Sequence, residues 1–193
     1  DNMIICNGGQ NALSTVLSAL TIPGDKILSE SLTYPGFTHL AKLHQLKHFG
    51  VQMDQWGLIP ESLESLCHVT GAKILYCIPN HQNPMATTLP EERRHEVAEI
   101  VRRNNLLILE DQVQGILHGE CPPSLKSLAP DRVIYCGSFS KVFAGGVRVG
   151  YILSPQRYLN SLVSAFYLNC LFASPIMTEV VCQAIQSGMM SQL

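Results

Sequence analysis

The sequence predicts an α/β fold: a three-layer α/β/α sandwich built around a mostly parallel sheet. Short apolar runs of strand length alternate with longer segments in which apolar residues recur at helical spacing. The connections are short and rich in Gly, Pro and Asn, as in folds where each strand leads directly into a helix. Sheets of this kind bind ligands at the carboxyl ends of their strands, so the residues after each predicted strand are candidates for a site.

Apolar runs bounded by turn residues predict the strands. The runs are short, and Ile, Leu and Val dominate them, which indicates strands that are buried on both faces. The predicted strands cover residues 3–6, 26–30, 47–53, 73–79, 106–109, 133–136 and 149–153.

Segments with apolar residues three or four positions apart predict the helices. Pro60 and Pro175 each stand at a predicted helix start, where the missing N–H of proline is tolerated. The predicted helices run from the turn at 7–11 to residue 20, from about 36 to 43, from 60 to 66, and over 90–105, 156–169 and 175–187, with a short turn of structure within 124–132.

The segment 90–105 shows how the helical pattern separates apolar from charged residues. Val97, Ile100 and Val101 fall on one face of the helix and are expected to pack inward. The charged residues are expected to form a solvated face, and they are Glu91, Arg94, Glu99, Arg102 and Arg103.

Composition and charge narrow the functional classes. The 193 residues are 46% apolar and 15% charged, which describes one globular domain with a substantial core. A formal net charge of -2 without a basic cluster argues against direct binding of nucleic acid by this chain. The apolar stretch 158–185 is interrupted by polar residues and a proline, so no membrane span is predicted, and the chain start lacks the pattern of a signal peptide.

The cysteines indicate the compartment. There are seven of them, an odd number, and none forms a C-x-x-C pair. They are therefore expected to be free thiols in a reducing compartment, which means a cytoplasmic protein. The histidines lack the spacing of metal ligands, so no metal site is predicted.

The residues after the predicted strand 133–136 carry the most distinctive chemistry. Lys141 follows a strand end and could form a Schiff base with an aldehyde. Ser138, Ser140 and Arg148 are suited to bind a phosphate, the arginine because its planar guanidinium matches phosphate oxygens. Taken alone, such a Ser/Lys segment is more often a surface loop.

Two further strand ends carry groups that could hold an anion or a flat ring. The Gly-rich turn at 7–11 opens a helix whose free N–H groups, including those of Gly9 and Gln10, favour an anion. It does not match G-x-G-x-x-G, so a dinucleotide site is not supported. Tyr34 lies between the carboxyl end of a predicted strand and the start of the following helix, and it could stack on a ring or only cover the core.

An amide and a carboxylate end the next two predicted strands. Asn83 is a neutral donor beside a proline, suited to bond a phenolate oxygen. Asp111 follows the buried strand 106–109, where a carboxylate is costly unless a cation pairs with it. A protonated pyridine nitrogen would be such a cation.

In chain order these motifs resemble those of the fold type I aminotransferases that depend on pyridoxal phosphate. The resemblance covers nearly all of the chain but only the large, cofactor-binding domain of that family. Within the family, the residues of these motifs are most similar to those of the aminotransferase-like half of MocR-type regulators of the GntR family. The motifs are Gly-Gly-Gln-Asn-Ala-Leu at 8–13, Tyr-Pro-Gly at 34–36, His-Gln-Asn-Pro at 81–84, Glu-Asp at 110–111, and Ser-Phe-Ser-Lys at 138–141 with Arg148.

The resemblance implies a role for each candidate. Lys141 would be the catalytic Schiff-base lysine, and Asp111 would keep the pyridine nitrogen protonated so that the ring can withdraw electrons. Tyr34 would stack on the ring, and Asn83 would bond its hydroxyl oxygen. The remaining candidates would hold the phosphate, and they are Gly9, Gln10, Ser138, Ser140 and Arg148.

The chain departs from the family pattern at several positions. Gln114 stands where the family usually has a tyrosine that bonds the ring oxygen, and it can still donate. Ala86 replaces a usual glycine, and Gly8 replaces a usual serine or threonine. The family's C-terminal small domain, with its carboxylate-binding arginine, and its N-terminal segment are not found. Residues 1–193 are therefore expected to be a single large domain from a longer protein.

The resemblance implies that this domain senses an amino acid, or the cofactor itself, in a bacterial transcription regulator, with DNA bound by a winged-helix domain outside the chain. A homodimer is expected from the family. Two alternatives remain open. The chain could be the large domain of a free-standing aminotransferase, which moves an amino group between an amino acid and a 2-oxo acid, or a scaffold that has lost the cofactor and serves for dimerisation.

Overall fold

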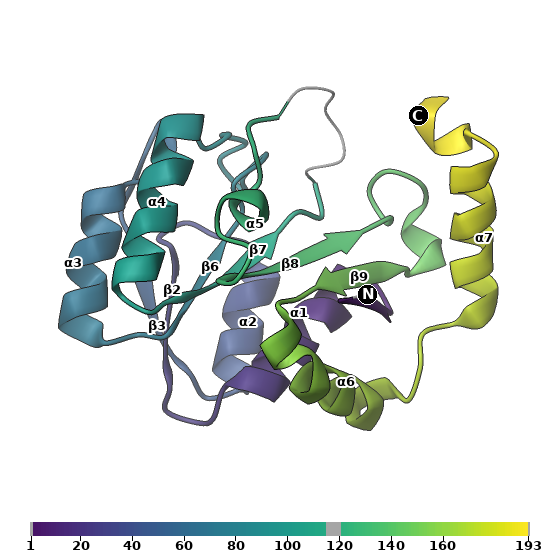
Figure 1. Cartoon of the computed structure of the whole chain (residues 1–193), viewed down its shortest axis with the longest axis horizontal. Coiled ribbons are helices and arrows are strands. Elements are labelled where there is room, and N and C mark those ends of the chain that lie inside the picture. The colour runs from purple at the N-terminus through teal and green to yellow at the C-terminus, as the bar shows by residue number, and fades with distance from the viewer. Residues whose placement is uncertain (1, 115–120, 193) are drawn as a thin grey trace.

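In the computed structural model of the chain, which describes residues 2–114 and 121–192, one seven-stranded sheet runs through the molecule (Figure 1). The strand order is β1-β9-β8-β7-β6-β2-β3. The strands are β1 (Met3–Cys6), β2 (Lys26–Glu30), β3 (Lys47–Val51), β6 (Ile74–Cys77), β7 (Leu107–Asp111), β8 (Val133–Ser138) and β9 (Gly150–Leu153).

The sheet is mostly parallel, as the sequence predicts. The pairs β2·β3, β2·β6, β6·β7 and β7·β8 are parallel, whereas β9 runs antiparallel to both of its neighbours, β8 and β1. The carboxyl ends of the parallel strands therefore meet at one edge of the sheet. Because β9 runs the other way, the residues that precede it lie at that same edge.

Helices cover both faces of the sheet, which confirms the three-layer α/β/α fold. One face carries α1 (Gly9–Leu20), α2 (Pro35–Leu43) and α6 (Gln156–Cys170). The other face carries α3 (Pro60–Thr70), α4 (Glu91–Arg103) and α5 (Leu125–Leu128), as Figure 1 shows.

A separate apolar core holds each helix layer to the sheet. Leu13 and Leu17 of α1 pack with Ile134 of β8 on one face, and Val101 of α4 packs with Ile108 of β7 on the other. All five side chains are at most 1% exposed. Each such burial stabilises the fold by about 1.5–3 kcal/mol, so the two cores fix the position of the strand ends.

The chain between β3 and α3 differs from the prediction. The predicted strand 47–53 ends at Val51, and a small hairpin follows, formed by β4 (Met53–Asp54) and β5 (Gly57–Leu58). The carboxylate of Asp54 closes its turn by accepting a hydrogen bond from the Trp56 N–H at 2.7 Å. This turn depends on a side-chain contact, so the apolar pattern did not reveal it.

Arg94 is also placed differently from the prediction. It was expected on the solvated face of its helix, but its side chain is fully buried. Its guanidinium donates to the carbonyl oxygens of Leu89 and Pro79 and to Oδ1 of Asn80, at 2.8, 3.0 and 2.5 Å. Buried acceptors at the end of β6 supply the hydrogen bonds that water would otherwise make.

The last α-helix, α7 (Pro175–Gln186), stands away from both helix layers in Figure 1. Its Val181 packs against Val147 and Val149, beside the short helix η2 (Gly145–Val147), whereas Ile176 is exposed. A short helix η3 (Met189–Gln192) follows. Within residues 2–114 and 121–192, no helix combines the length and apolarity that crossing a membrane would require.

Candidate functional site

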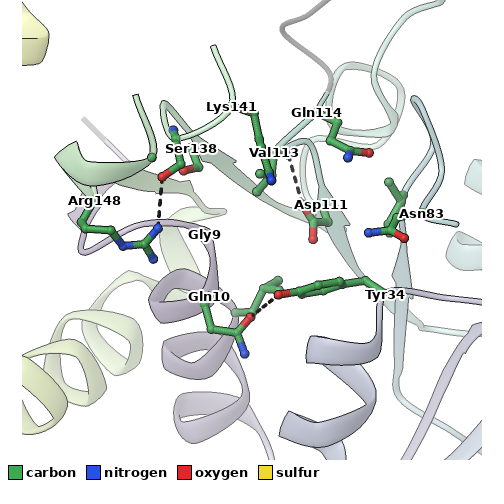
Figure 2. A pocket seen from close by; sticks show the side chains of 14 residues that line it. Gly9, Gln10, Tyr34, Asn83, Asp111, Val113, Gln114, Ser138, Lys141 and Arg148 are labelled. Carbon is green, nitrogen blue, oxygen red and sulfur yellow. Dashed lines mark hydrogen bonds between the residues drawn. The ribbon is translucent and has the colours of Figure 1, made fainter. Parts of the chain in front are cut away.

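A cavity of about 310 Å³ lies at the edge of the sheet where the parallel strands end (Figure 2). Its volume is within the range of sites for small molecules. The structure brings every predicted site residue to its lining: Gly9, Gln10, Tyr34, Asn83, Asp111, Gln114, Ser138, Ser140, Lys141 and Arg148. Asp111 and Ser138 are the last residues of β7 and β8, and the other residues come from loops or helix starts that follow β1, β2, β6, β7 and β8 or precede β9.

Lys141 lies in the loop after β8, and its amine points into the cavity in Figure 2. The side chain is exposed and makes no hydrogen bond or ion pair with the part of the chain that the structure describes. Ser138 fixes the start of this loop, because its hydroxyl accepts a hydrogen bond from the Ser140 N–H at 3.2 Å. The amine is therefore available to a ligand.

Asp111 is a buried carboxylate at the floor of the cavity. Its side chain is 5% exposed, and its oxygens accept hydrogen bonds from the Tyr76 hydroxyl at 2.7 Å and the Val113 N–H at 3.0 Å. No lysine, arginine or histidine among residues 2–114 and 121–192 forms an ion pair with it. Burial raises the pKa of the Asp111 carboxyl, although both hydrogen bonds oppose this effect.

Tyr34 and Gln10 form one wall of the cavity. The Tyr34 hydroxyl donates to Oε1 of Gln10 at 3.1 Å, which joins the start of α2 to the first turn of α1. Gly36 allows the Tyr34 ring to lie where it does, because a Cβ on Gly36 would be 2.3 Å from the ring. The ring presents a flat apolar surface to the cavity in Figure 2.

One corner of the cavity combines a cation with hydrogen-bond donors and is therefore suited to bind an anion. Arg148 donates from Nη1 to the Ser140 hydroxyl at 3.2 Å, and its guanidinium lies against Gly8 at the start of α1. A Cβ on Gly8 would be 2.7 Å from Nη2 of Arg148, so only glycine leaves room for this approach. The cation, the serine hydroxyl and the free N–H groups of the helix start therefore converge.

The backbone confirms that this corner is tightly constrained. Gly9 approaches the loop after β7 so closely that a Cβ would be 2.6 Å from Cγ2 of Val113. Arg148 has a φ of 50°, a left-handed conformation that costs a non-glycine residue about 1–3 kcal/mol. Strain of this kind is retained where the surrounding structure holds a side chain for a purpose.

Asn83 and Gln114 bring amides to the side of the cavity opposite Arg148 (Figure 2). Gln82 anchors the loop that carries Asn83, because its amide donates to the Leu32 carbonyl at 2.6 Å and accepts from the Met85 N–H at 2.9 Å. Neither Asn83 nor Gln114 bonds another described residue through its side chain. Both amides can therefore donate to a ligand oxygen.

Sequence reasoning missed part of the lining: Leu13, Ile78, Val113 and Gly145. Leu13 and Ile78 look like core positions in the sequence, and only the geometry shows that they also line the cavity. Gly145 belongs to the glycine-rich stretch after Lys141, and this stretch is the feature of the sequence that could have indicated its place in the lining. Within the described ranges, no group of three or more His, Cys, Asp or Glu side chains could hold a metal ion.

The sequence matches the protein family described as "Aminotransferase class I and II" over residues 1–191. It is 35% identical to an uncharacterised HTH-type transcriptional regulator, YdeF, of Bacillus subtilis, over 97% of this chain and 41% of that protein. It is 33% identical to a second such regulator, YjiR of Escherichia coli, over 91% of this chain and 38% of that protein.

Solved structures share the fold. The crystal structure of LysN, an alpha-aminoadipate aminotransferase from Thermus thermophilus complexed with N-(5'-phosphopyridoxyl)-L-leucine, matches with a TM-score of 0.91 and 27% identity. The match covers 97% of this chain and 50% of LysN. The chain thus spans half or less of the length of each of these relatives.

Proposed function

The chain belongs to the aminotransferase class I and II family, and on that premise we propose that it is the effector-sensing part of a longer MocR-type transcription regulator. The observation that carries the proposal is its similarity to two HTH-type regulators over nearly its whole length. In this assignment the chain binds a cofactor together with an amino acid substrate or effector. A domain outside residues 1–193 binds DNA.

The cofactor is pyridoxal 5'-phosphate, and the cavity fits each part of it. The corner of Arg148, Ser140 and the start of α1 supports an assignment to the phosphate. Asp111, a buried carboxylate with no cation beside it among the described residues, would gain one from a protonated pyridine nitrogen. Lys141, whose amine has no described partner, is the natural match for the aldehyde.

The other candidates complete the assignment. Gly9, Gln10 and Ser138 would join the phosphate contacts, since they surround the same corner of the cavity. Asn83 and Gln114 would donate to the ring hydroxyl oxygen, and Tyr34 would cover a face of the ring.

When bound, the cofactor supplies an aldehyde that reacts with amines and a ring that withdraws electrons from the bonds of the attached amino acid. The chain's residues provide the setting for this chemistry. Asp111 would hold a proton on the ring nitrogen, and Arg148 would anchor the phosphate. Lys141 would bind the aldehyde carbon, and once released from it, its amine could take a proton from the α-carbon of an amino acid.

A free-standing aminotransferase is the second candidate function. It is favoured by the match to LysN, an enzyme whose structure holds a phosphopyridoxyl derivative of leucine. In that case the chain would be the large domain of an enzyme that moves an amino group between an amino acid and a 2-oxo acid. The residues assigned above would serve both functions.

We also propose a cytoplasmic homodimer. The seven cysteines are free, and Cys6, Cys67, Cys77 and Cys136 are buried, which fits a reducing compartment. Apolar side chains lie exposed at the end of α6 and in the segment that follows, with Leu168 84% and Phe172 66% accessible, and a second subunit would cover them.

The test of the cofactor assignment is an absorbance scan of the full-length protein with added pyridoxal phosphate, followed by borohydride reduction and peptide mapping. The expected result is a reduced adduct on Lys141, and its loss in Lys141→Ala. The matched control is Lys42→Ala, an exposed lysine of α2 outside the cavity, which should keep the adduct. An adduct that persists in Lys141→Ala would refute the assignment, and no adduct at all would support a scaffold without cofactor.

Two further assays decide between regulator and enzyme. Amino-acid-dependent binding of the full-length protein to its own promoter DNA, with little turnover, is the result expected for the regulator. Steady transamination without DNA binding would instead establish the enzyme.

A further inference from the structure

Tyr76 is a buried residue of β6 whose hydroxyl contacts Asp111, the carboxylate at the floor of the cavity. Its side chain is 0% exposed, and its hydroxyl donates to Oδ2 of Asp111 at 2.7 Å. In the sequence, Tyr76 lies in a predicted strand, and the apolar pattern does not distinguish it from the core residues around it. The structure separates it from them, because it points a hydrogen-bond donor at the carboxylate of the neighbouring strand.

The Tyr76 ring is held in place by Phe37 of α2. The two rings are stacked, with centroids 3.6 Å apart and an interplanar angle of 5°, and Phe37 is also 0% exposed. Phe37 lies one helical turn after Tyr34, which lines the cavity. The stack therefore connects the support of Asp111 to the helix start that carries Tyr34.

Tyr76 stays a neutral donor under all ordinary conditions. Burial and the nearby Asp111 carboxylate raise the pKa of its hydroxyl well above the usual range. Burial raises the pKa of the Asp111 carboxyl, and the same hydrogen bond opposes that rise because it stabilises the ionised form. The second oxygen of Asp111, Oδ1, accepts from the Val113 N–H, so both oxygens are fixed.

We propose that Tyr76 is a positioning residue that orients the Asp111 carboxylate and weakens its basicity, so that the proton stays on the ring nitrogen of the cofactor. The inference rests on the proposed function, in which Asp111 faces that nitrogen. Without the Tyr76 hydroxyl, Asp111 becomes a stronger base and takes a larger share of the proton. The ring then withdraws electrons less well.

The experiment is nitrogen NMR of the whole protein loaded with pyridoxal phosphate that carries ¹⁵N in its ring. In Tyr76→Phe, which keeps the ring stack and removes only the oxygen, the ¹⁵N signal should move toward the position of neutral pyridine. Affinity for the cofactor should fall by about tenfold, the effect of one hydrogen bond to a charged group. The matched control is Tyr135→Phe on β8, which lies on the other side of β7 from β6. The Tyr135 ring stacks on Tyr151 outside the cavity, so loss of its hydroxyl should leave the signal unchanged.

The outcomes separate this inference from the proposed function. If the wild type binds the cofactor and Tyr76→Phe leaves the ¹⁵N signal in place, the role of Tyr76 is refuted while the site stands. If the wild type gives no ¹⁵N signal from bound cofactor, both the proposed function and the role of Tyr76 are refuted. In a double-mutant cycle, Asp111→Asn should abolish the effect of Tyr76→Phe, whereas additive effects would overturn the coupling.

A second variant covers the case in which Tyr76→Phe does not fold. Phe37→Leu keeps the Tyr76 hydroxyl but removes the stacked ring that fixes it. Its ¹⁵N signal should move in the same direction by a smaller amount. A signal identical to that of the wild type would count against the proposal.

Discussion

At the scale of single residues, the site depends on ionisable groups that are buried without an opposite charge in contact. Asp111, Glu30 and Arg94 are all at most 5% exposed, and none forms an ion pair within residues 2–114 and 121–192. Each is held instead by hydrogen bonds to neutral groups. Such groups make stability or binding depend on protonation, because burial penalises the charged form.

Glu30 at the end of β2 is the clearest case and leads to a prediction on pH. Its Oε1 accepts from the Ile78 N–H at 2.9 Å, and burial raises its pKa to about 7. In the unfolded chain a glutamate has a pKa of about 4.3, so between about pH 4 and 7 the folded state binds a proton that the unfolded state releases. The free energy of unfolding should therefore fall as the pH rises through this window, by at most about 4 kcal/mol.

The measurement is urea unfolding of the cofactor-free protein at pH 5 and pH 8, for the wild type and Glu30→Gln. Glutamine keeps an acceptor for the Ile78 N–H and cannot ionise, so the variant should lose this part of the pH dependence. Asp111 and Glu110 are also buried carboxyls with raised pKa, and the comparison removes their contribution because both proteins contain them. Parallel pH profiles in the two proteins would show that Glu30 does not titrate as argued.

At the scale of secondary-structure elements, the ends of the strands must be held in register with one another for the cavity to exist. Arg94 of α4 does this for β6, since it bonds the carbonyl of Pro79 and the side chain of Asn80. Asn80 in turn donates to Gln112 at 3.0 Å, just after β7. One buried guanidinium thus connects α4 to the loop that carries Asn83 and to the segment directly after Asp111, the last residue of β7.

Replacing this guanidinium should cost more than replacing an exposed one. In Arg94→Met the volume is largely kept, but the acceptors around Arg94 lose their donors. We expect a loss of about 3 kcal/mol or more in the free energy of unfolding. The control Arg103→Met removes an exposed arginine of the same helix, which pairs with Glu64, and should cost about 0.5 kcal/mol or less.

Urea unfolding curves of the two variants and the wild type give both values. Equal losses for Arg94→Met and Arg103→Met would mean that the buried network contributes little. A cofactor titration of Arg94→Met measures a second effect. Displacement of the loops after β6 and β7 should also lower the affinity for the cofactor.

Most elements, and most of the residues that line the cavity, could be predicted from the sequence, because both follow from local patterns. Apolar runs located the strands of the main sheet, and polar residues at their ends gave Asn83, Asp111 and Lys141. What escaped prediction depends on contacts between elements. Arg94 looked solvated because its acceptors come from distant loops, and Tyr76 looked like core because its partner lies on another strand.

At the scale of the whole molecule, apolar surface is distributed unevenly. It is concentrated on the end of α6, the segment that follows and the start of α7, where Leu168, Phe172 and Ile176 are 84%, 66% and 73% exposed. Figure 1 shows α7 at the margin of the molecule, away from the layers that cover the sheet. Large exposed apolar patches of this kind mark surfaces that another polypeptide covers.

A charge in this surface should therefore weaken the proposed homodimer. In Leu168→Glu and Phe172→Glu, a carboxylate would have to be buried in an apolar contact without a partner, so we expect the dimer dissociation constant to rise by about 30-fold or more. Val69→Glu is the matched control, since Val69 is 78% exposed on α3, in the opposite helix layer, and this change should leave the dimer intact. Sedimentation velocity over a range of concentrations measures all three. If Val69→Glu dissociates the dimer and the other two do not, the contact lies on the α3 side of the sheet; if none does, the α6–α7 surface is covered by something other than a second subunit.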